Sequence, residues 1–191
     1  MKTTLLILIT IAIFSNTTGC QNSTHNATDI PNAKVSYTDF ENLVKTVKKH
    51  RENRLINFDD FLEKSKVENT IILDTRSKIM YDRKHIKGAI HLNFSDFTQK
   101  NLSRLIPDKN TTILIYCNNN FDGDEINFAS KIFIPKPTKE DKTRSLTLAL
   151  NIPTYINLYG YGYKNVYELN ELISFTDRRI TYKGTTIINT K

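Results

Sequence analysis

The sequence contains few cysteines, and this scarcity excludes two common ways of stabilising a small protein. Only Cys20 and Cys117 occur among the 191 residues, so no framework of several disulfide bonds holds the fold. Cysteine and histidine residues also do not occur at the spacing of a zinc site. We therefore expect neither a metal nor a cofactor in this protein.

The sequence also lacks the charge pattern of a nucleic-acid-binding protein. The net charge is +7, but the basic residues form no clustered stripe with interleaved aromatic side chains. The densest basic stretch, residues 45–54, lies on an expected amphipathic helix. We interpret the positive charge as a lysine-rich solvated surface and expect no nucleic acid as a partner.

No apolar run near the N-terminus is long enough to cross a bilayer. The run from Leu5 to Phe14 is shorter than the roughly 20 residues that a spanning helix needs. It follows Lys2 and precedes small polar residues, a pattern typical of a secretory signal peptide. We expect residues 1–19 to be that signal peptide and residues 20–35 to be a polar linker, in a protein exported to the periplasm of a bacterium.

The segment Thr17-Thr18-Gly19-Cys20 resembles the cleavage box of a bacterial lipoprotein, in which the cysteine is lipidated. Gly19 fits this box, whereas Thr17 stands where Leu or Val is usual. Two outcomes stay open: lipidation of Cys20, which would anchor the protein to the membrane surface, or simple cleavage near Gly19. Either outcome leaves Cys117 as a lone thiol that is well buried or retained for its reactivity.

Two continuous apolar runs predict strands that are buried on both faces of a parallel sheet. They cover residues 70–74 and 112–117, and the second is expected at the centre of the sheet. Helical patterns alternate with these and other strand-like runs, which predicts an α/β fold with a mainly parallel sheet and helices on both faces. The further expected helices cover residues 37–50, 59–66, 77–85, a segment capped by Ser95, and a segment from Asn151; the further strands cover residues 89–93 and 165–169.

A long insertion follows the central strand. Residues 118–150 break the alternation, and two β-like pieces at 128–134 and 145–150 are expected to pair as a hairpin arm. We expect a closing helical turn at 171–175. The domain itself is predicted to cover residues 55–175, with a helical extension at 36–54 before it and a tail at 176–191 whose structure stays open.

Cys117 and Asp74 both stand at the carboxyl ends of predicted strands, where parallel sheets bind their ligands. The sequence order around them is Leu73-Asp74-Thr75-Arg76, then His85-Ile86-Lys87-Gly88-Ala89-Ile90, then the strand ending at Cys117, then Gly162 to Leu169. This order resembles the rhodanese domain over roughly residues 55–175. The chain departs from that family in having Lys84 and Lys87 where Gly and Pro are usual.

The resemblance implies a doubly wound domain and a cysteine, here Cys117, that carries sulfane sulfur as a persulfide. A small sulfur donor and a thiol acceptor would then be its partners. In the family, a cradle of backbone N–H groups and a helix N-terminus follow the cysteine directly and stabilise its thiolate. The corresponding candidates for substrate binding are Asn118, Asn119, Asn120, Phe121 and Arg144, and Asp74, Arg76 and His85 are expected to be structural residues near the site.

The loop after Cys117 differs from that family pattern. It has no Arg or Lys before Lys131, and either Lys131 or Arg144 is expected to supply the missing basic group. Three acidic residues would repel an anionic donor if they pointed inward: Asp122, Asp124 and Glu125. The next helix is expected only at Asn151, so we expect its dipole not to face Cys117 directly. Gly123 stands where a cysteine phosphatase needs its phosphate-binding arginine, which argues against that chemistry.

Two hypotheses therefore stay open for the function. In the first, the protein is an exported sulfurtransferase with Cys117 as the nucleophile. In the second, it is a catalytically silent rhodanese-like module whose loop at residues 118–144 binds a protein or envelope partner.

Overall fold

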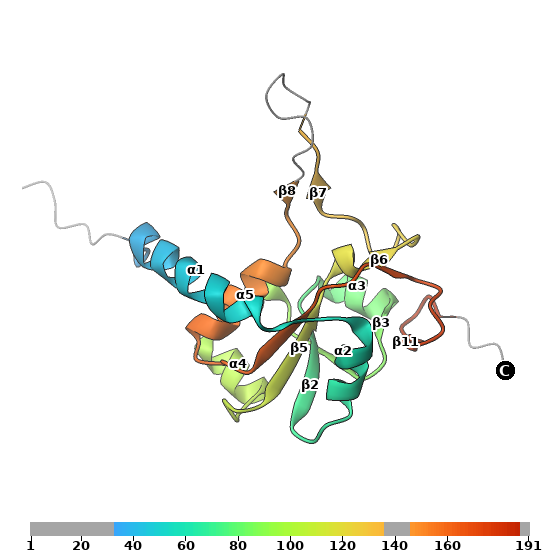
Figure 1. Cartoon of the computed structure of the whole chain (residues 1–191), viewed down its shortest axis with the longest axis horizontal. Coiled ribbons are helices and arrows are strands. Elements are labelled where there is room, and N and C mark those ends of the chain that lie inside the picture. The colour runs from blue at the N-terminus through green and yellow to red at the C-terminus, as the bar shows by residue number, and fades with distance from the viewer. Residues whose placement is uncertain (1–32, 136–145, 188–191) are drawn as a thin grey trace, which may run out of the picture. The chain divides into compact units, whose positions relative to one another are not determined.

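The computed structural model describes residues 33–135 and 146–187. The chain divides into the units Met1–Val35 and Ser36–Lys191, and the fold is that of the second unit. Its centre is a five-stranded, fully parallel sheet (Figure 1) with the strand order β1-β9-β5-β2-β4. These strands are β1 (Leu55–Ile56), β2 (Thr70–Asp74), β4 (Ala89–His91), β5 (Thr112–Tyr116) and β9 (Val166–Leu169).

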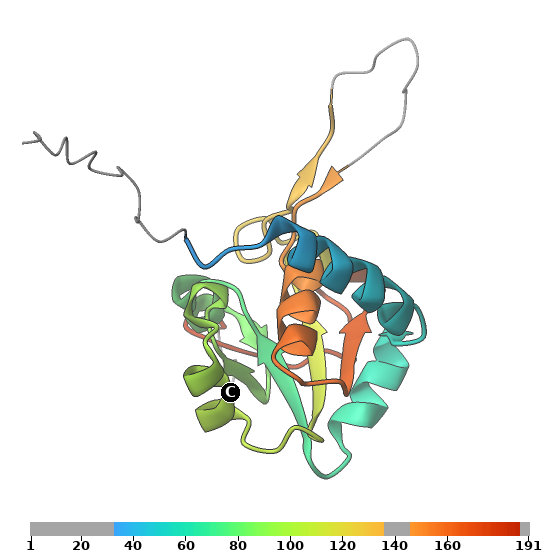
Figure 2. The ribbon, with the colours of Figure 1, turned by 90° about the vertical axis from the view of Figure 1, so that its left-hand side faces the viewer.

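Helices cover both faces of this sheet, as the sequence predicts. One face packs against α1 (Tyr37–Glu52), α4 (Gln99–Leu105) and α5 (Asn151–Gly160), and Figures 1 and 2 show α1 beside α5. The other face packs against α2 (Phe58–Ser65) and α3 (Lys78–Arg83). Side chains of β5 alternate between the two cores: Ile113 and Ile115 join the first, and Leu114 and Tyr116 join the second. The prediction that β5 is central and buried on both faces is confirmed.

Side-chain caps explain where the helices begin. Ser36 caps α1 by accepting a hydrogen bond from the backbone N–H of Asp39 at 3.1 Å. The predicted cap at Ser95 is wrong, because residues around it form the short 3-10 helix η1 (Phe94–Asp96) instead. Phe97 then returns to an extended conformation, and Thr98 caps α4 by accepting from the N–H of Asn101.

The segment after β9 also differs from its predicted helical turn. It forms β10 (Ile173–Ser174), which pairs in parallel with β6 (Phe121–Asp122) directly after the Cys117 loop. Ile173 is buried in the second core, and an extended backbone places it there while its polar groups pair with β6. The tail contributes β11 (Tyr182–Lys183), which pairs antiparallel with β3 (His85–Ile86).

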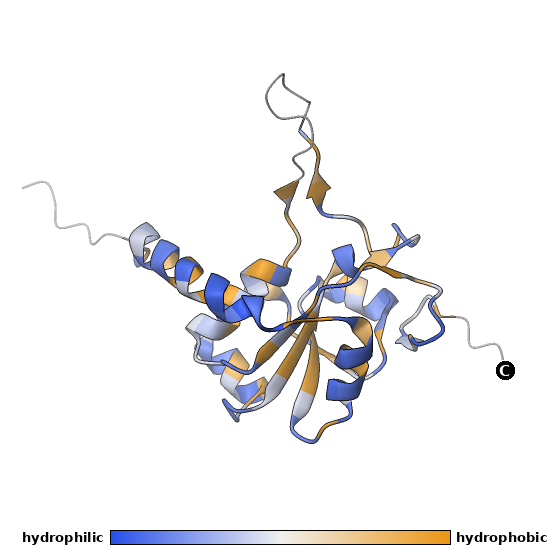
Figure 3. Ribbon diagram, viewed as in Figure 1, coloured by the Kyte–Doolittle hydropathy of each residue, from blue (hydrophilic) through white to orange (hydrophobic). Residues whose placement is uncertain are grey.

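The insertion forms the predicted hairpin arm, which leaves the body of the domain (Figure 1). Its strands are β7 (Ile132–Phe133) and β8 (Leu146–Thr147), and they pair antiparallel. Figure 3 shows that these strands are apolar, although they lie outside the core. Exposed large apolar side chains of the arm are Ile132, Phe133, Ile134, Leu146 and Leu148. In the part of the chain that the structure describes, no helix has both the length and the apolar character needed to cross a membrane.

A buried ion pair fixes the carboxyl edge of the sheet. The guanidinium of Arg76 donates to both carboxylate oxygens of Asp74, with the shortest distance 2.7 Å from Nη2 to Oδ2. Arg76 also donates to the carbonyls of Lys84 and Asn127, and Tyr116 Oη donates to Asp74. Both charged side chains are almost fully shielded from solvent, so each depends on the other for compensation of its charge.

Asp74→Ala should therefore lower the free energy of unfolding by about 3–5 kcal/mol, because it leaves the Arg76 guanidinium buried without its counter-ion. Urea denaturation followed by circular dichroism measures this loss. The matched control is Asp82→Ala, which removes the exposed ion pair with Lys78 and should cost less than about 1 kcal/mol. Equal losses in the two variants would contradict this assignment.

Candidate functional site

Cys117 follows β5 directly and lies at the bottom of a pocket of about 480 Å³. Its own side chain is 2% exposed. The pocket walls come from the loops after β2, β4 and β5, from α3, and from both sides of the hairpin arm. Besides Cys117, the lining residues are Arg76, Ser77, Met80, Asn93, Asn118, Ala129, Lys131, Leu148 and Leu150.

Two backbone N–H groups, from different parts of the chain, lie close enough to the Cys117 side chain to lower the pKa of its thiol. One belongs to Asn118, the next residue, and the other to Leu150, the N-cap residue of α5. The first and last residues of the hairpin arm lie side by side, since the N–H of Leu148 donates to the carbonyl of Lys131 at 2.6 Å. The start of α5 consequently meets Cys117, and our expectation that this helix would not face the cysteine is wrong.

The N–H groups and the burial of Cys117 have opposite effects on the pKa of its thiol, and burial has the larger effect. Burial raises the pKa of the Cys117 thiol, because the thiolate loses its contact with water. The N–H groups of Leu150 and Asn118 and the guanidinium of Arg76 lower the pKa, whereas the carboxylate of Asp74 raises it. The pKa remains above its ordinary value, so the thiol is largely protonated at neutral pH.

The three asparagines after Cys117 form the 3-10 turn η2 (Asn118–Asn120) and face different surroundings. Asn118 lines the Cys117 pocket, whereas Asn119 and Asn120 line a second pocket. The Asn120 amide accepts from the Cys117 N–H at 2.9 Å and from Asn151 Nδ2 at 3.3 Å. It also donates to the carbonyls of Leu169 and Glu171. Asn120 therefore positions the loop and is not free to bind a ligand.

The other predicted substrate-binding residues lie outside the Cys117 pocket or outside the described residues. Phe121 is buried in the second core, where its ring packs against Phe128 with 4.3 Å between centroids. Arg144 and Cys20 belong to the ranges that the structure does not describe. His85 lies near the site but not in it: its ring stacks on Tyr81, and its Nδ1 lies 2.7 Å from the Tyr81 carbonyl.

Among the residues that the structure describes, the charged side chains that line the Cys117 pocket are cationic, although the charge of Arg76 is compensated by Asp74. Lys131, from the segment before β7, lines the pocket together with Arg76, and no carboxylate side chain does so. The three acidic residues of the loop point elsewhere. Asp124 forms an ion pair with Lys84 at 2.8 Å, and Asp122 and Glu125 are exposed. Because none of these three carboxylates points into the pocket, they do not repel an anionic donor there.

Several wall residues could not be found by reading the sequence. Leu150 contributes through its backbone, and its position depends on the pairing of the arm strands. Met80 and Asn93 come from α3 and from the loop after β4, and their side chains carry no signature of a site. Lys131, one of two basic candidates, lines the pocket, and Arg144 lies outside the described residues.

One protein-family model matches most of the described chain. The family model of the rhodanese-like domain matches residues 57–171, which is more than half of the chain. No curated protein gives a match.

Solved structures similar to the chain include a protein from Bacillus halodurans, with 17% identity, a TM-score of 0.42, and coverage of 78% of this chain and 88% of that one. A rhodanese with anions from E. coli has 18% identity and a TM-score of 0.36, with coverage of 61% and 99%. A protein from Anabaena sp. has 20% identity and a TM-score of 0.40, with coverage of 65% and 79%.

The effect of the Leu150 N–H on the pKa of Cys117 leads to a direct prediction about the reactivity of this cysteine. Leu150→Pro removes this N–H and should slow alkylation of Cys117 by iodoacetamide about tenfold at pH 8, since a hydrogen bond to a charged group is lost. Leu150→Ala keeps the N–H and serves as the control. In all three proteins the rate should rise with pH, and the rise should occur at higher pH than for free cysteine because the pKa is raised. Equal rates in the two variants would show that this N–H does not stabilise the thiolate.

Proposed function

The chain belongs to the rhodanese-like domain family, and we propose on this basis that it is a sulfurtransferase that carries sulfane sulfur as a persulfide on Cys117. The observation that carries the proposal is the pocket that Cys117 lines together with Asn118 and Leu150, whose backbone N–H groups lower the pKa of its thiol. N–H groups at a helix start stabilise a negative charge on sulfur. A buried structural cysteine needs no such arrangement.

The proposed reaction has two steps, with Cys117 as the nucleophile in the first. Its thiol loses a proton to solvent, and the thiolate attacks the outer sulfur of a donor such as thiosulfate. A new S–S bond forms, the donor's S–S bond breaks, and sulfite leaves with the electron pair. In the second step a thiolate or cyanide takes the outer sulfur, and Cys117 leaves as a thiolate. The same two N–H groups face the negative sulfur in both steps.

The charges of the pocket support an anionic donor. Lys131 is exposed at the pocket wall, whereas Arg76 is held by Asp74. We propose that Lys131 attracts the donor and that Arg76 mainly shapes the wall. The Asn118 N–H would hold the sulfur that is transferred.

The second hypothesis, a silent binding module, is favoured by two other observations. The raised pKa of Cys117 lowers the fraction of thiolate at neutral pH, and the arm exposes apolar side chains that have no role in sulfur transfer. In this case the arm would bind a protein or envelope partner.

A thiosulfate:cyanide sulfurtransferase assay distinguishes the two hypotheses. The wild type should turn over above background, and Cys117→Ser should not. Lys131→Ala should raise KM for thiosulfate about threefold to fivefold, the factor expected for the loss of about 1 kcal/mol from a partly exposed charge. Lys87→Ala, an exposed lysine outside the pocket, is the matched control. Equal background turnover in wild type and Cys117→Ser would favour the silent module.

We also propose that the protein is exported and that a lipid on Cys20 anchors it to the membrane surface. The support is the apolar leader followed by Gly19-Cys20. Cys20→Ala should move the protein from the membrane fraction to the soluble fraction of cells that express it. Unchanged fractionation would contradict lipidation and favour simple cleavage.

A further inference from the structure

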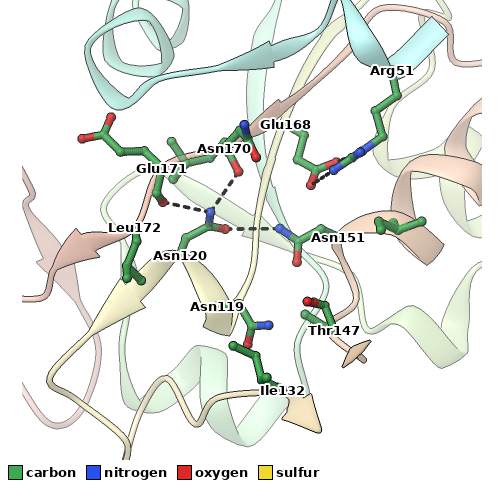
Figure 4. A pocket seen from close by; sticks show the side chains of 13 residues that line it. Arg51, Asn119, Asn120, Ile132, Thr147, Asn151, Glu168, Asn170, Glu171 and Leu172 are labelled. Carbon is green, nitrogen blue, oxygen red and sulfur yellow. Dashed lines mark hydrogen bonds and ion pairs between the residues drawn. The ribbon is translucent and has the colours of Figure 1, made fainter. Parts of the chain in front are cut away.

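A second pocket lies beside the Cys117 pocket, at the base of the hairpin arm (Figure 4). It has a volume of about 330 Å³, within the usual range of ligand sites, and shares no lining residue with the Cys117 pocket. Lys131 and Leu148 of the arm line the first pocket, whereas their neighbours Ile132 and Thr147 line the second. We call this second cavity the amide pocket, because four asparagines line it: Asn119, Asn120, Asn151 and Asn170.

Hydrogen bonds fix how two of these amides are oriented. Asn120 Oδ1 accepts from the Cys117 N–H, so the nitrogen of Asn151 must be the atom that faces it, at 3.3 Å. The Asn151 oxygen is then left without a hydrogen-bond partner within the described part of the chain. Asn119 Oδ1 accepts from the Lys131 N–H at 2.7 Å, and its nitrogen is left unpaired among the same residues.

The amide pocket thus holds one unused donor, Asn119 Nδ2, and one unused acceptor, Asn151 Oδ1. Both atoms are shielded from solvent, and an unpaired polar group in such a place is costly. A peptide group is the common neutral group that offers a carbonyl to the donor and an N–H to the acceptor. Three charged residues line the pocket, and each has a counter-ion: Arg51 and Glu168 form an ion pair with each other, and Glu171 Oε1 lies 3.6 Å from Nη2 of Arg179. The pocket therefore favours a ligand without net charge.

The rim of the amide pocket is apolar and exposed. Ile132 from the arm, Ile152 from α5 and Leu172 from the segment after β9 are 49%, 44% and 66% exposed. Three apolar side chains from separate segments around one opening would cover an apolar side chain of a ligand. None of the described residues that line the pocket is aromatic, so they offer no flat face on which a sugar ring would stack.

We propose that the amide pocket binds a neutral, extended peptide segment of a partner protein. One peptide group pairs with Asn119 and Asn151 after a small rotation of their side chains, and an adjacent apolar side chain packs on Ile132, Ile152 and Leu172. The proposal does not depend on sulfur transfer. A bound peptide would nevertheless lie close to Cys117, because the side chain of Asn120 is hydrogen-bonded both to Asn151 and to the backbone of Cys117.

The probe for this site is N-acetyl-leucine-N′-methylamide, an apolar side chain between two peptide groups. Titrated into the ¹⁵N-labelled protein, it should shift the side-chain amide signals of Asn119 and Asn151 in a saturable way. N-acetyl-glycine-N′-methylamide, which lacks the apolar side chain, should bind about tenfold more weakly. The same shifts in Cys117→Ser would show that the site works independently of the proposed sulfur transfer.

Ile152→Glu places a charge on the apolar rim and should weaken binding of the probe at least about tenfold. The matched control is Ile126→Glu, which alters an exposed isoleucine outside the amide pocket and should leave binding unchanged. No saturable shift, equal binding to both variants, or the same shifts with methyl glucoside in place of the peptide would overturn the proposal.

Discussion

One buried amide, that of Asn120, joins the three segments that make the Cys117 site. It accepts from the Cys117 backbone and from Asn151 at the start of α5, and it donates to the carbonyls of Leu169 and Glu171 after β9. All of its hydrogen-bonding capacity is used. The end of the central strand, the beginning of the helix and the exit of the neighbouring strand are therefore held together where the long arm interrupts the chain.

This arrangement lets the fold keep a helix start at the cysteine despite the insertion. The arm strands pair with each other, so the chain returns to the point that it left, and the Leu150 N–H reaches the sulfur. Burial and the N–H groups then oppose each other. Burial favours the neutral thiol, whereas the N–H groups and the cationic wall favour a negatively charged sulfur or donor. Such a site is better suited to holding a transferred sulfur away from water than to fast turnover.

The sequence predicted the parts of this structure that depend on local patterns. The runs at 70–74 and 112–117 identify β2 and β5 because strands buried on both faces need continuous apolar residues, and Ser36 identifies the start of α1 through its cap. The failures depend on distant contacts. Within the predicted helical turn at 171–175, Ile173 and Ser174 form a strand because β6, some fifty residues earlier, offers them a partner. The role of Leu150, and the division of three consecutive asparagines between two pockets, follow from the pairing of the arm and from no local signal.

The central claim is that the Cys117 sulfur lies where a second sulfur can be added and held. Mass spectrometry of the Cys117 peptide after incubation of the protein with thiosulfate tests it most directly, because it requires no knowledge of the natural acceptor. The account predicts that the peptide gains the mass of one sulfur atom and loses it again on treatment with cyanide. An unmodified peptide under conditions in which iodoacetamide alkylates Cys117 would contradict it.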